Sequence, residues 1–416
     1  MLDAIVPGLG MDQEALAQAP GYLSRQPILD RRGVVFGYEL LFHHAPGAKH
    51  VDPLGAGRHG LLDAMAVFGV ERFTAGSRAF LECSVESLVE DAWDGLPPAH
   101  LVLQIPLPAG SSAHLLRACR ALREKGFQIA LGRFDPAHTA GELLGLADYV
   151  KVDAAAFESP VWQAVCARLA GSRAIIVADR VQTHDTYCKA RALGIKYFQG
   201  FYFCSPELIP TNTIPAHHAQ QFRILHELFK DPLDLKTLSP LVMADPSLVY
   251  RLLRFVNSPL CAVRETVTSV EAAIMMLGDA QFRRIATLAI QCGLSQDQPP
   301  ELLNMALVRA RFCSAAAPAC GLDPDEQYLI GMLSLLPPML RVPMHTILPA
   351  LPFRDEVRDA LAGHSRPERA LLSWIEHIEE NDVAGCEEIT VRFNFDRDKL
   401  VDTYWHALGD TTVPLN

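Results

Sequence analysis

The feature that most constrains this chain is a regular alternation, in its first half, of short apolar runs with longer stretches of helical spacing. The runs are rich in β-branched and aromatic residues, which favour strands. Seven runs are predicted to be strands: Val34–Phe42, Ala79–Leu81, Leu101–Ile105, Gln128–Leu131, Tyr149–Val152, Ala174–Ala178 and Tyr197–Phe201. Helical spacing between them is clearest over 112–125 and 185–193, and Gly194 follows the second stretch as a C-terminal cap would. Repeated βα units predict a parallel sheet covered by helices, and this many predict a closed barrel of the TIM type.

A different pattern begins after a stretch rich in Pro, Ser and Thr, Pro206–Pro215, which breaks both periodicities. Beyond it no strand pattern is found and amphipathic helices follow one another closely, so the fold class is α/β followed by all-α. The predicted division is a lead-in over 1–20, a barrel domain over 21–207, a linker over 208–216, and a helical domain with a C-terminal extension over 217–416.

Two helix starts in the second half have clear capping signals. Asp245 is followed by Pro246, which predicts an N-cap with proline at the first helical position. Thr268 and Glu271 have the spacing of a capping box, and Gly278 predicts the end of the helix that they open.

The charge of the chain argues against nucleic acid and anionic membranes as partners. Half of the residues are hydrophobic, which predicts a compact core, and the formal net charge is -11. Such a chain has no overall attraction for phosphate backbones. The basic clusters Arg283–Arg284 and Arg309 with Arg311 lie in helical patterns and are interpreted as solvated faces.

Targeting and metal signals are also absent from the sequence. The first residues, MLDAIVPGLGMDQEAL, lack the basic region and long apolar core of a secretion signal, so we expect a cytoplasmic protein with no membrane span. The ten cysteines form no C-x-x-C pair, and the adjacent His43 and His44 would point to opposite faces of a strand. We therefore expect no metal site and no cofactor.

Three short runs contain polar residues where strands of a barrel would end. Gly37–Leu41, Lys151–Asp153 and Gln199–Phe201 occur in that order, and the phrase SRQPILDRRGVVFGYELLF includes the first of them. Residues 21–207 thereby resemble the EAL-type cyclic-di-GMP phosphodiesterase domain. The resemblance implies two divalent cations held by several carboxylates and an Asn, with a Lys that assists activation of the attacking water.

Five positions match the site that this resemblance implies. Glu39, Lys151 and Asp153 match directly, Asp179 is a shorter acid where the family has Glu, and Gln199 lies in the third run. Two interpretations stay open for the first three residues: a residual site, or polar pairs inside the barrel mouth. Lys151 and Asp153 would share one face of a strand and could neutralise each other.

Six positions depart from the family pattern, and they are decisive for the predicted activity. The substituted positions are His43 for Arg, Glu82 for Asn, Gln104 for Glu, Gly132 and Arg133 for a pair of Asp, and Gln182 for Glu. Arg133 would oppose bound cations by Coulomb repulsion, which weakens a metal site beyond the loss of ligands. We therefore predict no catalytic residues and no bound metal in the barrel.

The second half carries a resemblance of its own. The run DLKTLSPLVMADPSLVYRLLRFVNSP, followed by TSVEAAIMMLG, resembles the HDOD domain, a helical relative of HD phosphohydrolases. The whole chain is similar to the subfamily that couples a degenerate EAL domain to a C-terminal HDOD domain. The HD ligand set needs a His-Asp dipeptide, and His184-Asp185 lies in the other half, so no hydrolysis is expected in the helical half.

The sequence thus predicts that the chain is not an enzyme. The leading hypothesis is a catalytically inactive bacterial signal-transduction protein that acts through protein–protein contacts, with unidentified signalling proteins or a second copy of the chain as partners. The alternative is a receptor that binds cyclic-di-GMP without cleaving it, with Arg133 pairing with phosphate. An active phosphodiesterase is the third hypothesis.

Overall fold

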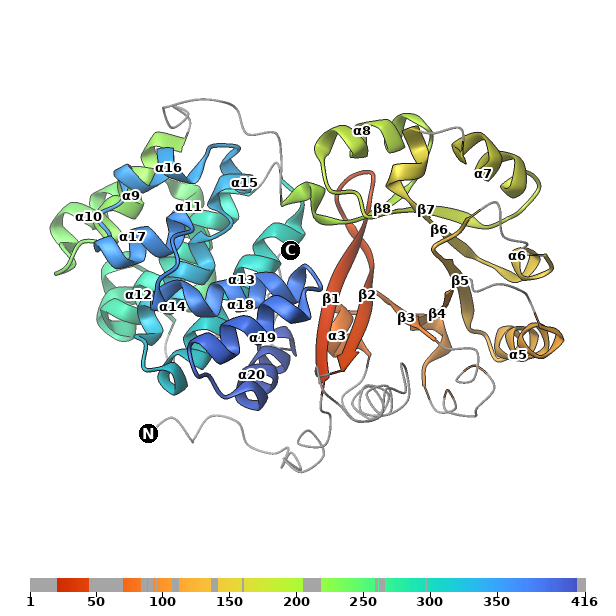
Figure 1. Cartoon of the computed structure of the whole chain (residues 1–416). Coiled ribbons are helices and arrows are strands. Elements are labelled where there is room, and N and C mark those ends of the chain that lie inside the picture. Colours follow the sequence, from red (N-terminus) through yellow and green to blue (C-terminus); the bar gives the residue numbers. More distant parts are fainter. Residues whose placement is uncertain are drawn as a thin grey trace.

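The structure, a computed structural model, comprises a barrel and a helical domain that lie side by side (Figure 1). It describes residues 21–44, 70–83, 96–106, 112–135, 141–158, 161–204, 218–258, 266–295 and 298–409, together with Leu88, Trp93 and Cys261. The predicted lead-in over 1–20 and linker over 208–216 lie outside these residues, so the domain boundaries stay predictions.

Eight strands close into a barrel in chain order, which confirms the predicted closed barrel and adds one strand to the seven predicted runs. They are β1 Gly21–Asp30, β2 Val35–His44, β3 Arg78–Glu82, β4 Leu101–Pro106, β5 Gln128–Gly132, β6 Tyr149–Asp153, β7 Ile175–Asp179 and β8 Tyr197–Gln199. The helices of this half are α3 Glu71–Thr74, α5 Ala113–Glu124, α6 Leu143–Leu146, α7 Val161–Leu169 and α8 His184–Ala192. Each of the strands β2 to β8 overlaps one of the seven predicted runs.

The first strand departs from the prediction of a wholly parallel sheet. β1 was missed, and it runs antiparallel to both of its neighbours, β2 and β8. The middle of β1 carries Ser24, Arg25 and Gln26 in place of an apolar run. These polar side chains hydrogen-bond to other parts of the chain, including the helical domain, so the strand has no simple alternation that a periodicity could reveal.

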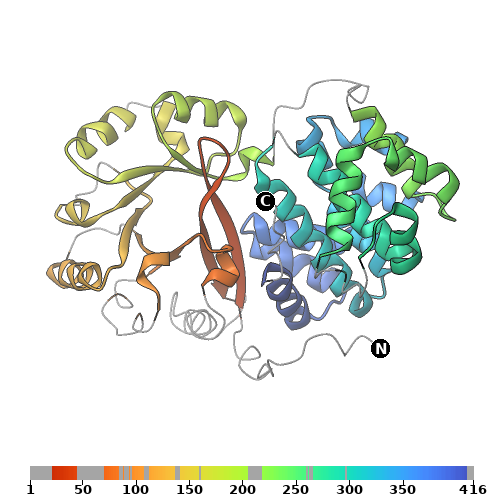
Figure 2. The same cartoon turned by 180° about the vertical axis from the view of Figure 1, so that it is seen from behind.

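The second half consists of helices in the described part of the chain, as predicted (Figure 2). They are α9 Ala219–Leu228, α10 Leu235–Met243, α11 Pro246–Val256, α12 Val270–Leu294, α13 Pro300–Ala316, α14 Pro324–Leu333, α15 Leu336–Leu340, α16 Met344–Ile347, α17 Asp355–Ala362, α18 Pro367–Glu379, α19 Val383–Arg392 and α20 Arg397–Gly409. The backbone of α12 leaves helical geometry at Gly278, where the sequence predicted an end. Within the described residues, no helix combines the length and the apolar character needed to cross a membrane.

One of the two predicted caps is confirmed and the other is displaced. The Asp245 side chain caps α11 by accepting a hydrogen bond from the third residue beyond it. The predicted start at Thr268 is one residue early, because Ser269 is the cap of α12. Glu271 accepts a hydrogen bond from Ser239 of α10 and so ties two helices together.

A continuous apolar cluster joins the barrel to the helical domain. It includes Leu29 and Leu40 of the first two strands and Leu302 and Met305 of α13. β1 also contacts α18 and α20, and Figure 1 shows β1 and β2, in red, next to the helical domain. Burial of shared apolar surface therefore holds the two domains together.

Arg309 is buried, which corrects its interpretation as part of a solvated face. Its Nη2 donates to Glu379 Oε2 at 2.6 Å, and Nη1 donates to Glu376 Oε1 at 3.4 Å and to Ser334 at 3.0 Å. The two glutamates lie on α18, so this guanidinium fixes the end of α18 to α13. A periodic pattern shows which face of a helix is polar but not that a charged partner will cover it.

Gly331 tests how closely α13 and α14 are packed. A Cβ atom at Gly331 would lie 2.6 Å from the backbone nitrogen of Ala310 and from the carbonyl group of Arg309. Gly331→Ala is expected to lower the free energy of unfolding by about 1–3 kcal/mol, measured by urea denaturation. Gly145→Ala is the control, since a Cβ there meets nothing within 4 Å, and it should leave stability unchanged or raise it by up to about 1 kcal/mol. Equal stability of the two variants would contradict the close helix contact.

Candidate functional site

A cavity of about 660 Å³ opens at the carboxyl ends of the barrel strands. Its size lies within the range of about 300–1,000 Å³ that is usual for ligand pockets. The residues predicted for a site are gathered there from six strands or the segments that follow them: Glu39, Glu82, Gln104, Arg133, Lys151, Asp179 and Gln182. This cavity, called the mouth below, is the candidate site.

A buried ion pair lies in the mouth. Lys151 Nζ donates to Glu39 Oε1 at 2.7 Å, and Gln199 donates to the other oxygen of the same carboxylate. Burial alone would raise the pKa of Glu39, but the charge of Lys151 and hydrogen bonds from Lys151, Gln199 and Gln104 together lower it. Glu39 is therefore held as an anion by a cation of the same chain.

The predicted pairing of Lys151 with Asp153 is wrong. Asp153 instead forms an ion pair with Arg180, with 3.1 Å between Oδ2 and Nη2, and both side chains are more than one-third exposed. Lys151 and Asp153 are separated by one position on β6, but Lys151 forms its ion pair with the buried carboxylate of Glu39 on β2. Sequence spacing predicted their shared strand but not this cross-barrel partner.

Two other carboxyl groups of the mouth are less firmly ionised. Burial raises the pKa of Glu82, and the neighbouring charge of Glu39 raises it further. Burial is also the largest cause of the raised pKa of Asp179, which Lys151 partly offsets. Both groups are therefore easier to protonate than free carboxyl groups.

Two arginines of the mouth stand at left-handed backbone positions. Arg133 has a φ of 50° directly after β5, and Arg180 has a φ of 56° directly after β7. Non-glycine residues adopt this region at a cost, and such residues are concentrated at functional sites. Arg133 is exposed to the mouth and has no hydrogen-bond or ion-pair partner among the described residues. Arg180 was not predicted as a site residue, although its place directly after a barrel strand was a usable signal.

The remaining predicted positions lie around the mouth or outside the described side chains. A Cβ at Gly132 would lie 3.1 Å from Gln104 Nε2, so the missing side chain leaves space for Gln104. Gln199 is buried beneath Glu39. His43 lies in β2, but its side chain is outside the described part of the structure.

The residues present do not fit the two-cation site that the family resemblance implies. Among the described residues, no three His, Cys, Asp or Glu side chains are grouped so that they could hold a metal ion. Arg133 and Lys151 add two cations to the same cavity, and their charges oppose a bound metal. The described residues of the mouth therefore do not form the two-cation site of the family pattern.

Two amide oxygens in this region lack hydrogen-bond donors. Gln104 Oε1 and Gln199 Oε1 are buried and have no partner among the described residues. Buried polar atoms are normally satisfied by protein, water or ligand. Of the two residues, Gln104 lines the mouth, so its oxygen is the acceptor nearest to a donor that enters the cavity.

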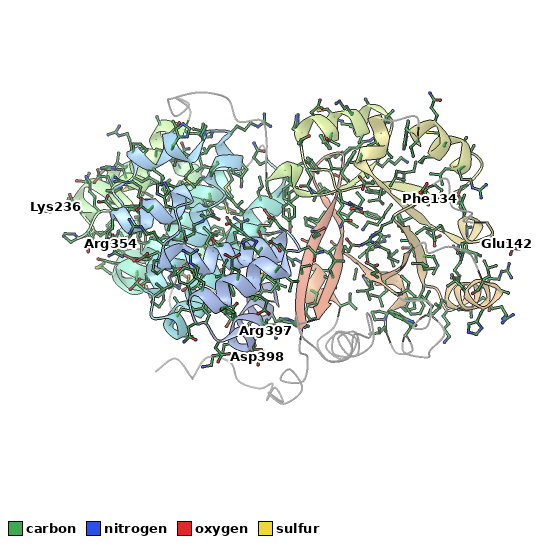
Figure 3. All side chains as sticks on the ribbon, in the orientation of Figure 1. Phe134, Glu142, Lys236, Arg354, Arg397 and Asp398 are labelled. Carbon is green, nitrogen blue, oxygen red and sulfur yellow. The ribbon has the colours of Figure 1, made fainter. Side chains whose placement is uncertain are left out.

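A larger cavity of about 840 Å³ lies in the helical domain, but its cations are already paired. Arg284 forms an ion pair with Asp325, Arg354 with Glu326, and Arg283 donates to backbone carbonyl groups. Figure 3 labels Arg354 on the helical domain and Phe134 in the barrel, where Phe134 directly follows Arg133. The unpaired guanidinium makes the mouth the stronger candidate for an anionic ligand.

Comparison with family models identifies both halves of the chain. The model of the EAL domain matches residues 74–206, and the model of the HDOD domain matches residues 214–339. The arrangement of an EAL domain followed by an HDOD domain, predicted from the sequence, is therefore confirmed.

Two curated relatives span most of the chain. One is the cyclic di-GMP phosphodiesterase CdgJ of Vibrio cholerae serotype O1, 30% identical over 90% of this chain and 88% of the relative. The other is the uncharacterized protein YuxH of Bacillus subtilis, 26% identical over 93% of this chain and 97% of the relative.

Solved structures of EAL proteins align with part of the chain. The FimX EAL domain of Pseudomonas aeruginosa bound to c-di-GMP covers 46% of this chain and 92% of its own, at 19% identity and a TM-score of 0.35. The manganese and cy-diGMP complex of Klebsiella pneumoniae BlrP1 covers 48% and 56%, at 22% identity and a TM-score of 0.37. These TM-scores are too low for a conclusion about function.

The prediction that the chain is not an enzyme is wrong. A relative 30% identical over nine-tenths of the chain is named a cyclic di-GMP phosphodiesterase. The prediction treated each substituted ligand as lost activity. The mouth nevertheless holds the carboxyl groups of Glu39, Glu82 and Asp179 in one cavity. Replacements at single positions of the family pattern were therefore not a sufficient basis for predicting that the chain is inactive.

The Glu39–Lys151 pair can be tested by stability. Lys151→Met would leave the Glu39 carboxylate buried without its cation and should lower the free energy of unfolding by about 3–5 kcal/mol in urea denaturation. The double variant Glu39→Gln/Lys151→Met should recover more than half of the loss, because it removes both charges of the pair.

The matched control for this pair is Asp153→Asn, which breaks the more exposed ion pair with Arg180. It should cost below about 1 kcal/mol. A Lys151→Met protein as stable as the control would show that Glu39 does not depend on Lys151.

Proposed function

This chain belongs to the family of proteins that join an EAL domain to an HDOD domain, and we propose that it is a cyclic-di-GMP signalling protein that binds the dinucleotide at its mouth. The observation that carries the proposal is the guanidinium of Arg133, which lines the mouth without a partner among the described residues. A guanidinium presents a planar set of donors that matches the oxygens of a phosphate.

The choice of dinucleotide comes from the Vibrio cholerae relative, whose name states that it acts on cyclic di-GMP. Two features of the mouth support the same ligand. Its volume of about 660 Å³ suits a small molecule, and the oxygen of Gln104, which has no donor among the described residues, can accept from a bridging water or a ligand donor.

The carboxyl groups of the mouth do not prevent anion binding. The charge of Glu39 is compensated by Lys151, and burial raises the pKa values of Glu82 and Asp179. Arg133 then provides a positive charge that forms no ion pair or hydrogen bond with the described residues, although it lies close enough to Glu82 to lower the pKa of that group. We expect a phosphate of the ligand to bind at the guanidinium of Arg133, on the side of the cavity where this charge lies.

Protein partners and cellular location remain separate expectations. Unidentified signalling proteins or a second copy of the chain as partners, and a cytoplasmic location, stay predictions.

Calorimetric titration of cyclic-di-GMP into the full chain tests the proposal. We expect saturable binding with one site per chain. Arg133→Gly should weaken it at least about tenfold, because a hydrogen bond to a charged group contributes about 1.5–3 kcal/mol. Glycine accepts the φ of 50° at this position, so the variant should stay folded.

Arg168→Ala is the control for this titration, since it removes an arginine from the exposed face of α7, away from the mouth. It should bind as the wild type does. Absence of heat from folded wild-type protein would overturn the proposed function. The same samples, supplied with Mg²⁺ or Mn²⁺ and analysed for linear product, would show whether binding leads to hydrolysis.

A further inference from the structure

The mouth is not formed by the barrel alone. Glu380 and Asn381, which lie in the turn between α18 and α19, line it together with the residues from the strands. Both turn residues are exposed, and both belong to the helical domain. A ligand that fills the mouth therefore meets side chains of both domains.

The turn is held in place by hydrogen bonds to β1. Ser24 Oγ donates to Asn381 Oδ1 at 3.3 Å, and Gln26 Nε2 donates to the carbonyl oxygen of Glu379 at 3.3 Å. Asn381 has a φ of 68°, the left-handed conformation that ends many helices. These contacts fix the backbone from which the side chain of Glu380 extends.

The turn is also anchored from behind and linked to the floor of the mouth. Arg309 of α13 holds the Glu379 carboxylate through both oxygens. On the other side, Gln199 Nε2 donates to Gln26 Oε1 at 3.0 Å and also donates to Glu39. The backbone of the turn that carries Glu380 is therefore fixed at the edge of a hydrogen-bonded network that spans both domains.

Among the described carboxylates that line the mouth, Glu380 is the exposed one. Glu39 is occupied by Lys151 and Gln199, whereas Glu82 and Asp179 are half-buried and burial raises their pKa values. The side chain of Glu380 has no hydrogen-bond or ion-pair partner among the described residues. Its two oxygens are free to accept hydrogen bonds from a ligand.

We infer that the turn of the helical domain forms one wall of the dinucleotide site and that Glu380 selects guanine. This inference rests on the proposed function. The Watson–Crick edge of guanine presents two adjacent donors, N1–H and the N2 amino group, which match the two oxygens of a carboxylate. Adenine has an acceptor at N1, which would face a carboxylate oxygen without a proton between them.

The effect of removing Glu380 on affinity differs in sign between two roles of this residue. If Glu380 acted only as a negative charge near an anionic ligand, its removal would tighten binding of every cyclic dinucleotide. If it pairs with guanine, its removal weakens binding of cyclic-di-GMP and leaves cyclic-di-AMP unchanged or bound more tightly.

The experiment is calorimetric titration of both dinucleotides into the full chain and into Glu380→Gln. The amide keeps the shape of the side chain but places an NH₂ group opposite one guanine donor. We expect cyclic-di-GMP affinity to fall about tenfold and its preference over cyclic-di-AMP to fall by at least as much. Glu388→Gln on α19 removes the same charge at an exposed position outside the lining of the mouth and should bind as the wild type does.

The outcomes separate this inference from the proposed function. Wild-type protein that binds no cyclic-di-GMP overturns both. Wild-type binding with an unchanged or higher affinity in Glu380→Gln overturns the role of Glu380 alone. Because Glu380 is exposed and unpaired, equal melting temperatures for the two glutamine variants should show that a loss of affinity does not come from unfolding.

Discussion

The apolar surface that the barrel and the helical domain bury against each other is the constraint on which the rest of the structure depends, and the ion pair between Arg25 of β1 and Glu301 of α13 lies within that contact. The side chains of this pair are only 5% and 1% exposed, with Arg25 Nη2 and Glu301 Oε1 3.8 Å apart, and the Tyr38 hydroxyl donates to Glu301 at 2.7 Å. Removing one member of a buried pair leaves an uncompensated charge and costs several kcal/mol. The face of the barrel is therefore held against the helical domain, which keeps the α18–α19 turn beside the mouth.

Much of the architecture follows from local patterns. β2 to β8 overlap the predicted apolar runs because apolar residues occupy one face or both faces of each strand. The Asp245 cap was predictable because it involves only residues that are close in the sequence. The gathering of Glu39, Arg133 and Lys151 was predictable for a related reason. Residues that follow the strands of one barrel meet at one end, however far apart they lie in the sequence.

Features that depend on distant partners could not be predicted in this way. β1 was missed because its polar residues are satisfied across a domain contact, and Arg309 was misassigned because its carboxylate partners lie on another helix. The pairing of Lys151 with Glu39, and the presence of Glu380 in the mouth, likewise require the folded chain. Neither a spacing nor a motif relates Glu380 to residues of the first strands.

The domain contact has a consequence for synthesis of the protein on the ribosome. Domains generally fold as units from the N-terminal end, so the barrel strands, which end at Gln199, can assemble while α13 and α18 are still untranslated. During that interval Arg25 has no Glu301 to pair with, and β1 exposes a surface that the finished protein buries. Until α13 has been synthesised, the apolar and charged surface that β1 presents to the helical domain has to stay in contact with solvent.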